Sequence, residues 1–226
     1  MMMVGYLFLN KIGAWGHRLV VYLVVISILF FIGLALFKKL SNSSKILVAL
    51  IGLGLASDIV ARFIAAATRY STPGYHLYIP LQYFLLALFY GIHLKKYGLW
   101  FSYSPLLMLV LAILNTIYFQ SIWAIPSNMV LICSLSYIIY ALITFNYLLN
   151  NVSEVSLLKS DLFWSNAITL AYFTCTFFCW SFYNFFVKKK INTTLIADII
   201  YYANHIYYLT LGMAIIMNSR KKKNVK

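Results

Sequence analysis

Acidic residues and cysteines are scarce in this sequence of 226 residues. Four Asp and Glu stand against eighteen Lys and Arg, so only 10% of the chain is charged and the formal net charge is +14. A soluble domain of average composition is about one quarter charged, so this composition excludes an ordinary soluble domain. Because 63% of the residues are hydrophobic and the mean hydropathy is +0.86, we expect an all-α, polytopic membrane protein.

Several motifs that carry chemistry are also missing. The three cysteines, Cys133, Cys175 and Cys179, all fall within long apolar runs, which argues against a disulfide framework or a zinc site. The four histidines lack the His-x-x-x-His spacing of a metal hydrolase, and neither a Gly-x-Ser-x-Gly nucleophile motif nor a glycine-rich phosphate loop occurs. We therefore expect no metal, no cofactor and no catalytic residue of a recognisable type.

Long apolar stretches fill most of the chain. A helix needs about 20 mostly apolar residues to cross a bilayer, and seven stretches satisfy this requirement. We predict a seven-helix transmembrane domain over residues 19–217, preceded by an interfacial segment (1–18) and followed by a basic tail (218–226). The pieces between spans are too short to fold as a soluble domain, so any activity is expected inside the bundle. The spans are Leu19–Phe37, Ile46–Thr68, Tyr75–Leu94, Leu99–Phe119, Asn128–Leu149, Leu162–Val187 and Leu195–Met217.

The distribution of Lys and Arg between the two sides of the predicted bundle indicates its orientation. With seven spans, eleven of these residues fall on the side of the C-terminus and six on the side of the N-terminus. Because positive charge is enriched in cytoplasmic loops, we predict the N-terminus outside and the C-terminus in the cytoplasm, although the triplet Lys188 to Lys190 argues against it. The charges flank spans, so the basic tail is expected to contact anionic lipid rather than nucleic acid.

Three ionisable residues fall clearly within predicted spans: Asp58, Arg62 and Asp198. Each is costly in a bilayer, by about 2.5 to 3.5 kcal/mol on insertion scales, so such residues are the first candidates for function. Asp58 and Arg62 are four residues apart, which places them on one helical face in the favourable order for an ion pair. Mutual neutralisation within the second span is therefore an alternative to a functional role.

Further polar residues are predicted at a matching depth. On the seventh span, Asp198 shares a face with two tyrosines and a histidine, and the third and fourth spans each contribute an amide. We expect these groups to line a polar cavity that opens to the outside and is closed below by Asp58 and His205. The alternative is a network of interhelical hydrogen bonds that only holds the bundle together. The predicted cluster is Asp58, Arg62, Gln82, Asn115, Asp198, Tyr201, Tyr202 and His205.

One proline falls inside the third span, next to the predicted cavity. Pro80 removes the hydrogen bond to the carbonyl of His76 and is expected to kink the helix near its outer end. A kink beside Gln82 suits a hinge at a binding pocket, although many membrane helices contain proline without such a role.

The last third of the chain carries a family resemblance. The Leu162-Phe163-Trp164 start of the sixth span and Asn204-His205 of the seventh resemble small, uncharacterised seven-span inner-membrane proteins of bacteria. The stretch from Tyr78 to Gln82 is also similar, with Gln82 where an acid is expected. The resemblance implies a multi-pass protein of the bacterial inner membrane and supplies no activity.

Two functions fit these patterns. The first is a sensor or accessory subunit that binds a small polar or amphipathic ligand from outside, together with a membrane or cytoplasmic protein partner. The second is a small transporter that uses Asp58, Arg62 and Asp198 as its substrate or proton site. Catalysis with Asp58 or Asp198 as the acid and His205 as the base stays open, but no residue pattern specifies a reaction.

Overall fold

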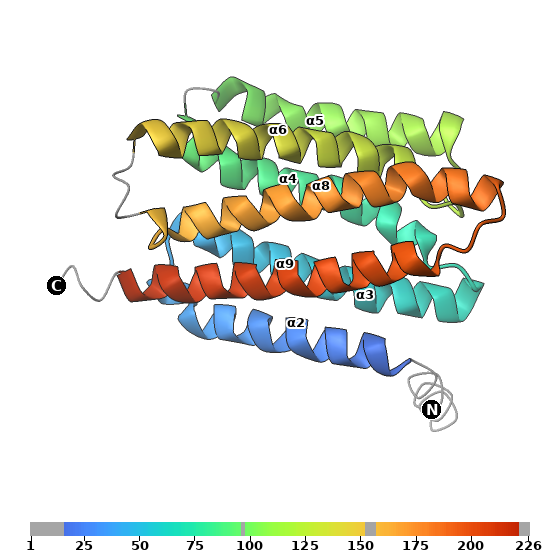
Figure 1. Cartoon of the computed structure of the whole chain (residues 1–226), viewed down its shortest axis with the longest axis horizontal. Helices are drawn as coiled ribbons and strands as arrows, with labels where there is room; N and C mark the ends of the chain where they lie inside the picture. Colours follow the sequence, from blue (N-terminus) through green and yellow to red (C-terminus); the bar gives the residue numbers. More distant parts are fainter. Residues whose placement is uncertain (1–15, 96–97, 152–156, 222–226) are drawn as a thin grey trace.

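The computed structural model describes residues 16–95, 98–151 and 157–221, and all regular secondary structure within these ranges is helical. Seven long helices lie nearly parallel and alternate in direction to form one bundle (Figure 1). A short 3₁₀ helix, η1 (Phe37–Lys39), follows α2, and a single π-helical turn, η3 (Asn115–Phe119), follows α5. The long helices are α2 (His17–Leu36), α3 (Asn42–Thr68), α4 (Thr72–His93), α5 (Gly98–Leu114), α6 (Ser127–Asn151), α8 (Asp161–Lys188) and α9 (Thr194–Lys221).

Six of the seven helices are long and apolar enough to cross a membrane: α2 with η1, α3, α5 with η3, α6, α8 and α9. The remaining helix, α4, carries Pro80, Gln82 and several tyrosines, which lower its hydropathy. It packs against α3, α5 and α6, so protein rather than lipid covers much of its surface. The chain is thus an integral, multi-pass membrane protein.

The outer surface of the bundle is apolar. On α2, Val21, Ile28 and Phe31 are each more than half exposed, and α5 presents Leu106 and Tyr103 in the same way. Soluble proteins rarely expose continuous apolar faces of this length, whereas helices that face lipid do so necessarily. This surface is therefore suited to the hydrocarbon interior of a bilayer.

Capping residues place several helix starts earlier than the predicted spans. Ser41 caps α3, its Oγ accepting a hydrogen bond from the Ser44 amide at 3.3 Å, so this helix starts before Ile46. Pro73 lies in the first turn of α4, where its missing N–H has no consequence. The cap of α8 is Ser160, whose side chain accepts from the Phe163 amide, and Asp161 is the first residue of the helix.

Both predicted terminal segments differ from the structure where it describes them. Residues 1–15 lie outside the described part, and His17 and Arg18 form the first turn of α2 rather than a separate segment. At the other end α9 continues to Lys221, so the first residues of the predicted tail are helical. Asn218 there donates to Asp161 Oδ2 at 2.8 Å and accepts from the Ser41 amide at 2.9 Å. One amide side chain thereby joins the ends of α3, α8 and α9.

Glycines allow α2 to pack closely on α3 and α9. A Cβ atom added to Gly52 of α3 would lie 2.5 Å from the Phe30 ring of α2. A Cβ atom on Gly212 of α9 would lie equally close to Leu29. Close approach at small residues is the usual packing device of membrane helices, since lipid supplies no hydrophobic force between them.

We expect Gly52→Leu to loosen the contact between α2 and α3 and to lower the thermal stability in detergent, because overpacking costs about 1 to 3 kcal/mol. Gly98→Leu is the matched control, since a Cβ atom at Gly98 meets nothing within 4 Å. Melting temperatures of the purified variants measure the difference. Equal melting of the two variants would show that this contact does not hold α2.

Candidate ligand-binding site

Two adjoining cavities lie at the end of the bundle that contains the start of α2 and the α8–α9 connection. The deeper one, the inner chamber, has a volume of about 310 Å³. The outer one, the vestibule, has about 460 Å³ and is more open to the surroundings. Both contain the same residues at their junction: Tyr22, Asp58, Tyr75, Trp180, Ile200 and Asn204. The cavities therefore form one continuous path from the end of the bundle to its centre.

Aromatic side chains make up much of the inner chamber's wall. They come from five helices, α2, α4, α6, α8 and α9, so the chamber lies between helices that are distant in sequence. Tyr78 and Tyr208 join their hydroxyl groups at 3.4 Å, and Tyr172 donates to Asn204 Oδ1 at 2.7 Å. These bonds fix the rings in place. The aromatic lining is Tyr22, Tyr75, Tyr78, Tyr137, Tyr172, Phe173, Trp180 and Tyr208.

One charged side chain, that of Asp58, is found among the described residues that line the inner chamber. Gln82 of α4 also lines it and is 7% exposed. Arg62, one turn further along α3, lines the vestibule instead. Asp58 and Arg62 do not form an ion pair within 4.0 Å. Among the described side chains, the ion pair present joins Arg18 to Asp198. The inner chamber therefore carries a carboxylate without a neighbouring cation in direct contact.

Two deeply buried hydroxyl groups on the chamber wall have no hydrogen-bond partner among the described residues. They are Ser134 Oγ and Tyr137 Oη, both on α6, and their residues are 1% and 0% exposed. The partly buried Ser57 on α3 adds a third hydroxyl of this kind. Buried polar groups in proteins are nearly always paired, and each unpaired one costs about 1 to 3 kcal/mol. Water or a ligand in the chamber would supply the missing partners.

Packed tyrosines close the chamber on its inner side. The Tyr83 ring packs in a tilted arrangement against that of Tyr137, with the ring centroids 5.5 Å apart, and its hydroxyl forms a hydrogen bond with that of Tyr140 at 2.5 Å. Tyr140 in turn accepts from Trp100 Nε1 at 3.0 Å. Two turns further along α4, Tyr90 donates to Asn166 Oδ1 at 3.1 Å. This tyrosine layer, formed by Tyr83, Tyr90 and Tyr140, separates the chamber from the opposite end of the bundle.

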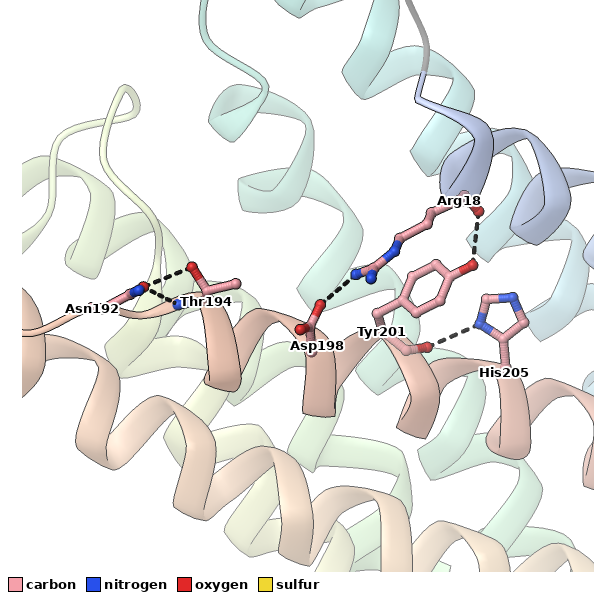
Figure 2. A network of polar contacts seen from close by, with 6 residues as sticks. All are labelled: Arg18, Asn192, Thr194, Asp198, Tyr201 and His205. Carbon is pink, nitrogen blue, oxygen red and sulfur yellow. Dashed lines mark hydrogen bonds and ion pairs between the residues drawn. The ribbon is translucent and has the colours of Figure 1, made fainter.

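A polar network joins α2 to α9 beside the vestibule (Figure 2). Arg18 Nη1 lies 2.5 Å from Asp198 Oδ1, and the Tyr201 hydroxyl donates to the Arg18 carbonyl at 2.9 Å. His205 Nδ1 donates to the Tyr201 carbonyl at 2.9 Å, and its ring lies 5.0 Å from that of Tyr22. The network fixes the start of α2 on α9, at the rim of the path into the chamber.

The structure brings together only part of the predicted cluster. Asp58 and Gln82 line the inner chamber, while Arg62 and Tyr201 line the vestibule. The other four predicted residues do not line either cavity: Asn115, Asp198, Tyr202 and His205. Asp198 and His205 belong to the network around Arg18, and Tyr202 is exposed on the surface of α9. His205 therefore does not close the cavity from below as predicted.

Asn115 belongs to a local amide network in the connection between α5 and α6. Its Nδ2 donates to Gln120 Oε1 at 3.1 Å, and its Oδ1 accepts from Asn128 at 3.2 Å. The π-helical turn η3 begins at Asn115, and the connection that follows contributes Ile125 and Pro126 to the chamber wall. Asn115 is thus satisfied within this connection and supports the chamber only indirectly.

Pro80 lies inside α4, between two residues that line the chamber, Ile79 and Gln82. The first turns of α4 are anchored by His76, whose ring nitrogens lie 2.8 Å from Thr116 Oγ1 and 3.0 Å from the Ala124 carbonyl. The predicted hinge therefore falls at the chamber wall, just beyond the anchored segment.

Residues that the sequence did not single out make up most of the site. Arg18 supplies the partner of Asp198, and Tyr137 with Ser134 supplies the unpaired hydroxyls. Apolar periodicity hides such residues, because tyrosine and serine inside a span look like ordinary packing. The excess of tyrosine, nineteen residues, was the available signal. Among the described residues no group of three His, Cys, Asp or Glu side chains could hold a metal ion.

Access to the chamber can be measured with cysteine probes in a background in which the three native cysteines are replaced by alanine. We expect Gln82→Cys and Arg62→Cys to react with a polar thiol reagent because they line the path. Ala141→Cys is the control, since Ala141 is fully buried on the far side of Tyr137 along α6. A Gln82→Cys protein that reacts no faster than the control would show that water does not reach the chamber.

No protein-family model, curated protein or solved structure matches the chain.

Proposed function

We propose that this membrane protein binds a small polar or amphipathic ligand in the inner chamber and acts as a sensor or an accessory subunit of a membrane assembly. The observation that carries the proposal is the pair of unpaired, buried hydroxyls that face the same cavity as Asp58. A chamber with a largely aromatic wall and a few convergent polar groups is the usual form of a small-molecule site. Helix packing alone gives no reason for a carboxylate at this position.

The closed inner side of the chamber favours binding over passage. The tyrosine layer of Tyr83, Tyr90 and Tyr140 is buried, with each ring at most 2% exposed, and it is tied across α4, α5, α6 and α8 by hydrogen bonds. A ligand that enters from the vestibule would reach this layer and stop. The same layer would pass a change in chamber occupancy to the opposite end of the bundle, as a sensor requires.

The charge distribution supports a cytoplasmic C-terminus. Because the helices alternate in direction, Lys38, Lys45, Lys95, Lys159 and Arg220 fall at the end of the bundle opposite the chamber (Figure 1). Positive residues near span ends favour the cytoplasmic side, and they would contact anionic lipid there. With α4 as the seventh span, the chamber then opens to the outside of the bacterial inner membrane, the location that the family resemblance implies.

A small transporter is the second candidate function. Two helix features favour it: Pro80, which cannot donate a backbone hydrogen bond, lies inside α4 at the chamber wall, and the π-helical turn η3 follows α5. Transporters place broken helices at their substrate sites. In this function Asp58 and Arg62 would meet the substrate, and opening of the tyrosine layer would release it on the other side. Asp198 would act at the rim through Arg18.

Ligand binding can be tested by screening small molecules for an increase in the melting temperature of the purified protein. A ligand present at 100 times its dissociation constant stabilises by about 2.7 kcal/mol. We expect Asp58→Asn to remove the increase and Asp161→Asn, a matched change at the opposite end, to keep it. If stabilising ligands act equally on both variants, they do not bind in the chamber.

The two candidate functions differ in the amount of ligand that the protein takes up. In proteoliposomes, a sensor binds no more than one ligand per chain, and the amount does not grow with time. A transporter accumulates ligand in the lumen beyond that ratio, and Asp58→Asn abolishes the accumulation. Time-resolved uptake of a radiolabelled ligand found in the screen decides between them.

The orientation has a separate test. We expect green fluorescent protein fused after residue 226 to fluoresce in a bacterial host and alkaline phosphatase fused at the same point to be inactive, because the C-terminus is cytoplasmic. Active phosphatase with a dark fluorescent protein would reverse the orientation and make the chamber open to the cytoplasm.

A further inference from the structure

We propose that the inner chamber is selective for a small organic cation, namely an ammonium compound that also carries a hydroxyl or similar hydrogen-bonding group. This inference rests on the proposed ligand-binding function and names the chemical class of the ligand. Three properties of the chamber carry it: its charge, its aromatic wall and the position of its unpaired hydroxyls.

The charge of the chamber favours a cation. Asp58 lines it, and the described residues around it include no Lys, Arg or His. Arg18 and Asp198 form an ion pair beside the vestibule, so their charges offset one another. Outside direct contact with a cation, a carboxylate in a protein interior is poorly stabilised, so a bound ammonium group would supply the missing charge.

The aromatic wall favours a cation of low hydration. A ring face attracts a cation through its quadrupole, and cages of aromatic rings are the usual receptors for methylated ammonium groups. Eight aromatic side chains line this chamber: Tyr22, Tyr75, Tyr78, Tyr137, Tyr172, Phe173, Trp180 and Tyr208. A small metal ion is usually held by several carboxylates or other charged ligands, whereas Asp58 is the one carboxylate among the described residues that line this chamber.

The unpaired hydroxyls indicate a second polar group on the ligand. Asp58 belongs to α3, whereas Ser134 and Tyr137 belong to α6, so the two kinds of polar group lie on different helices of the chamber wall. A ligand whose ammonium group faces Asp58 would place its other end toward α6. A hydroxyl there would satisfy Tyr137 Oη or Ser134 Oγ, which no described protein group does.

Arg62 has the opposite effect on such a ligand. It lines the vestibule together with Asp58, at a spacing of one helical turn on α3. Its charge repels an arriving cation and compensates part of the charge of Asp58 while the chamber holds no ligand. Removal of Arg62 is therefore expected to leave cation binding intact or to strengthen it. An anionic ligand would depend on Arg62 instead.

Three probes of nearly equal shape test the charge selectivity. Choline is the cation, 3,3-dimethylbutan-1-ol is its neutral analogue with carbon in place of nitrogen, and 3,3-dimethylbutyrate is an anion of similar size. Binding is measured by titration calorimetry on the full-length protein in an uncharged detergent. We expect choline to bind at least about tenfold more tightly than the neutral analogue, as a charge-assisted contact implies.

Variants then assign the effect to named residues. Asp58→Asn is expected to remove the preference for choline, whereas Arg62→Gln keeps choline binding within about twofold or strengthens it. Tyr78→Leu should weaken binding by about two- to thirtyfold, while Tyr78→Phe, which keeps the ring, should weaken it less. If Asp58→Asn does not fold, Arg62→Gln decides alone: tenfold weaker choline binding in that variant overturns the cation proposal.

The outcomes separate this inference from the proposed function. Preferred binding of dimethylbutyrate that is lost in Arg62→Gln would overturn the cation class and leave a ligand-binding chamber. If all three probes fail to bind while screened ligands still depend on Asp58, the ammonium class is likewise overturned and the proposed function stands. Failure of every screened ligand together with an unreactive Gln82→Cys probe would overturn both.

Discussion

The need to satisfy polar groups away from lipid determines the arrangement of this bundle. Hydrocarbon offers no hydrogen-bond partners, so every polar side chain on a spanning helix must face protein or enclosed water. The outward faces of α2 and α5 are accordingly mostly apolar, while Asp58, Gln82 and the tyrosines that line the chamber face inward. Helix α4 follows the same rule, since its Gln82 is buried at the chamber wall while Leu77 and Phe84 are exposed on its outer face.

The two ends of the bundle satisfy this constraint in different ways. At the end with the basic residues, polar groups pair with one another, as Asn218 does with Asp161 and Ser41. The middle is closed by hydroxyl bonds among buried tyrosines such as Tyr83 and Tyr140. At the chamber end the pairing is incomplete, and Tyr137 and Ser134 keep unused hydroxyls beside a cavity. Interhelical bonds in membranes average well under about 1 kcal/mol, so an incomplete network gains little stability and is better understood as a binding surface.

Sequence reasoning predicted the helices well and the site in part, for physical reasons. Long apolar runs are a strong signal because a span must match the bilayer thickness, and all seven predicted stretches are helical. Asp58 and Gln82 were found because polar residues stand out within such runs. Asn115 and His205 were misplaced because depth along a helix does not specify which neighbour a side chain meets. Arg18 was assigned to the interface, since nothing in the sequence shows that it lies beside Asp198, 180 residues later. The aromatic lining of the inner chamber was not predicted residue by residue, because a tyrosine within a span can equally well serve helix packing.

The central claim is that a cation occupies the inner chamber against Asp58. Arsenocholine, in which arsenic replaces the nitrogen of choline, tests it directly, because the arsenic atom can be located by anomalous X-ray diffraction from crystals of the complex. If the ammonium group binds against Asp58, one anomalous peak is expected inside the chamber, within contact distance of the Asp58 carboxylate and surrounded by tyrosine rings, and no peak is expected in crystals of Asp58→Asn. A peak confined to the vestibule near Arg62, or a peak that persists unchanged in Asp58→Asn, would contradict it.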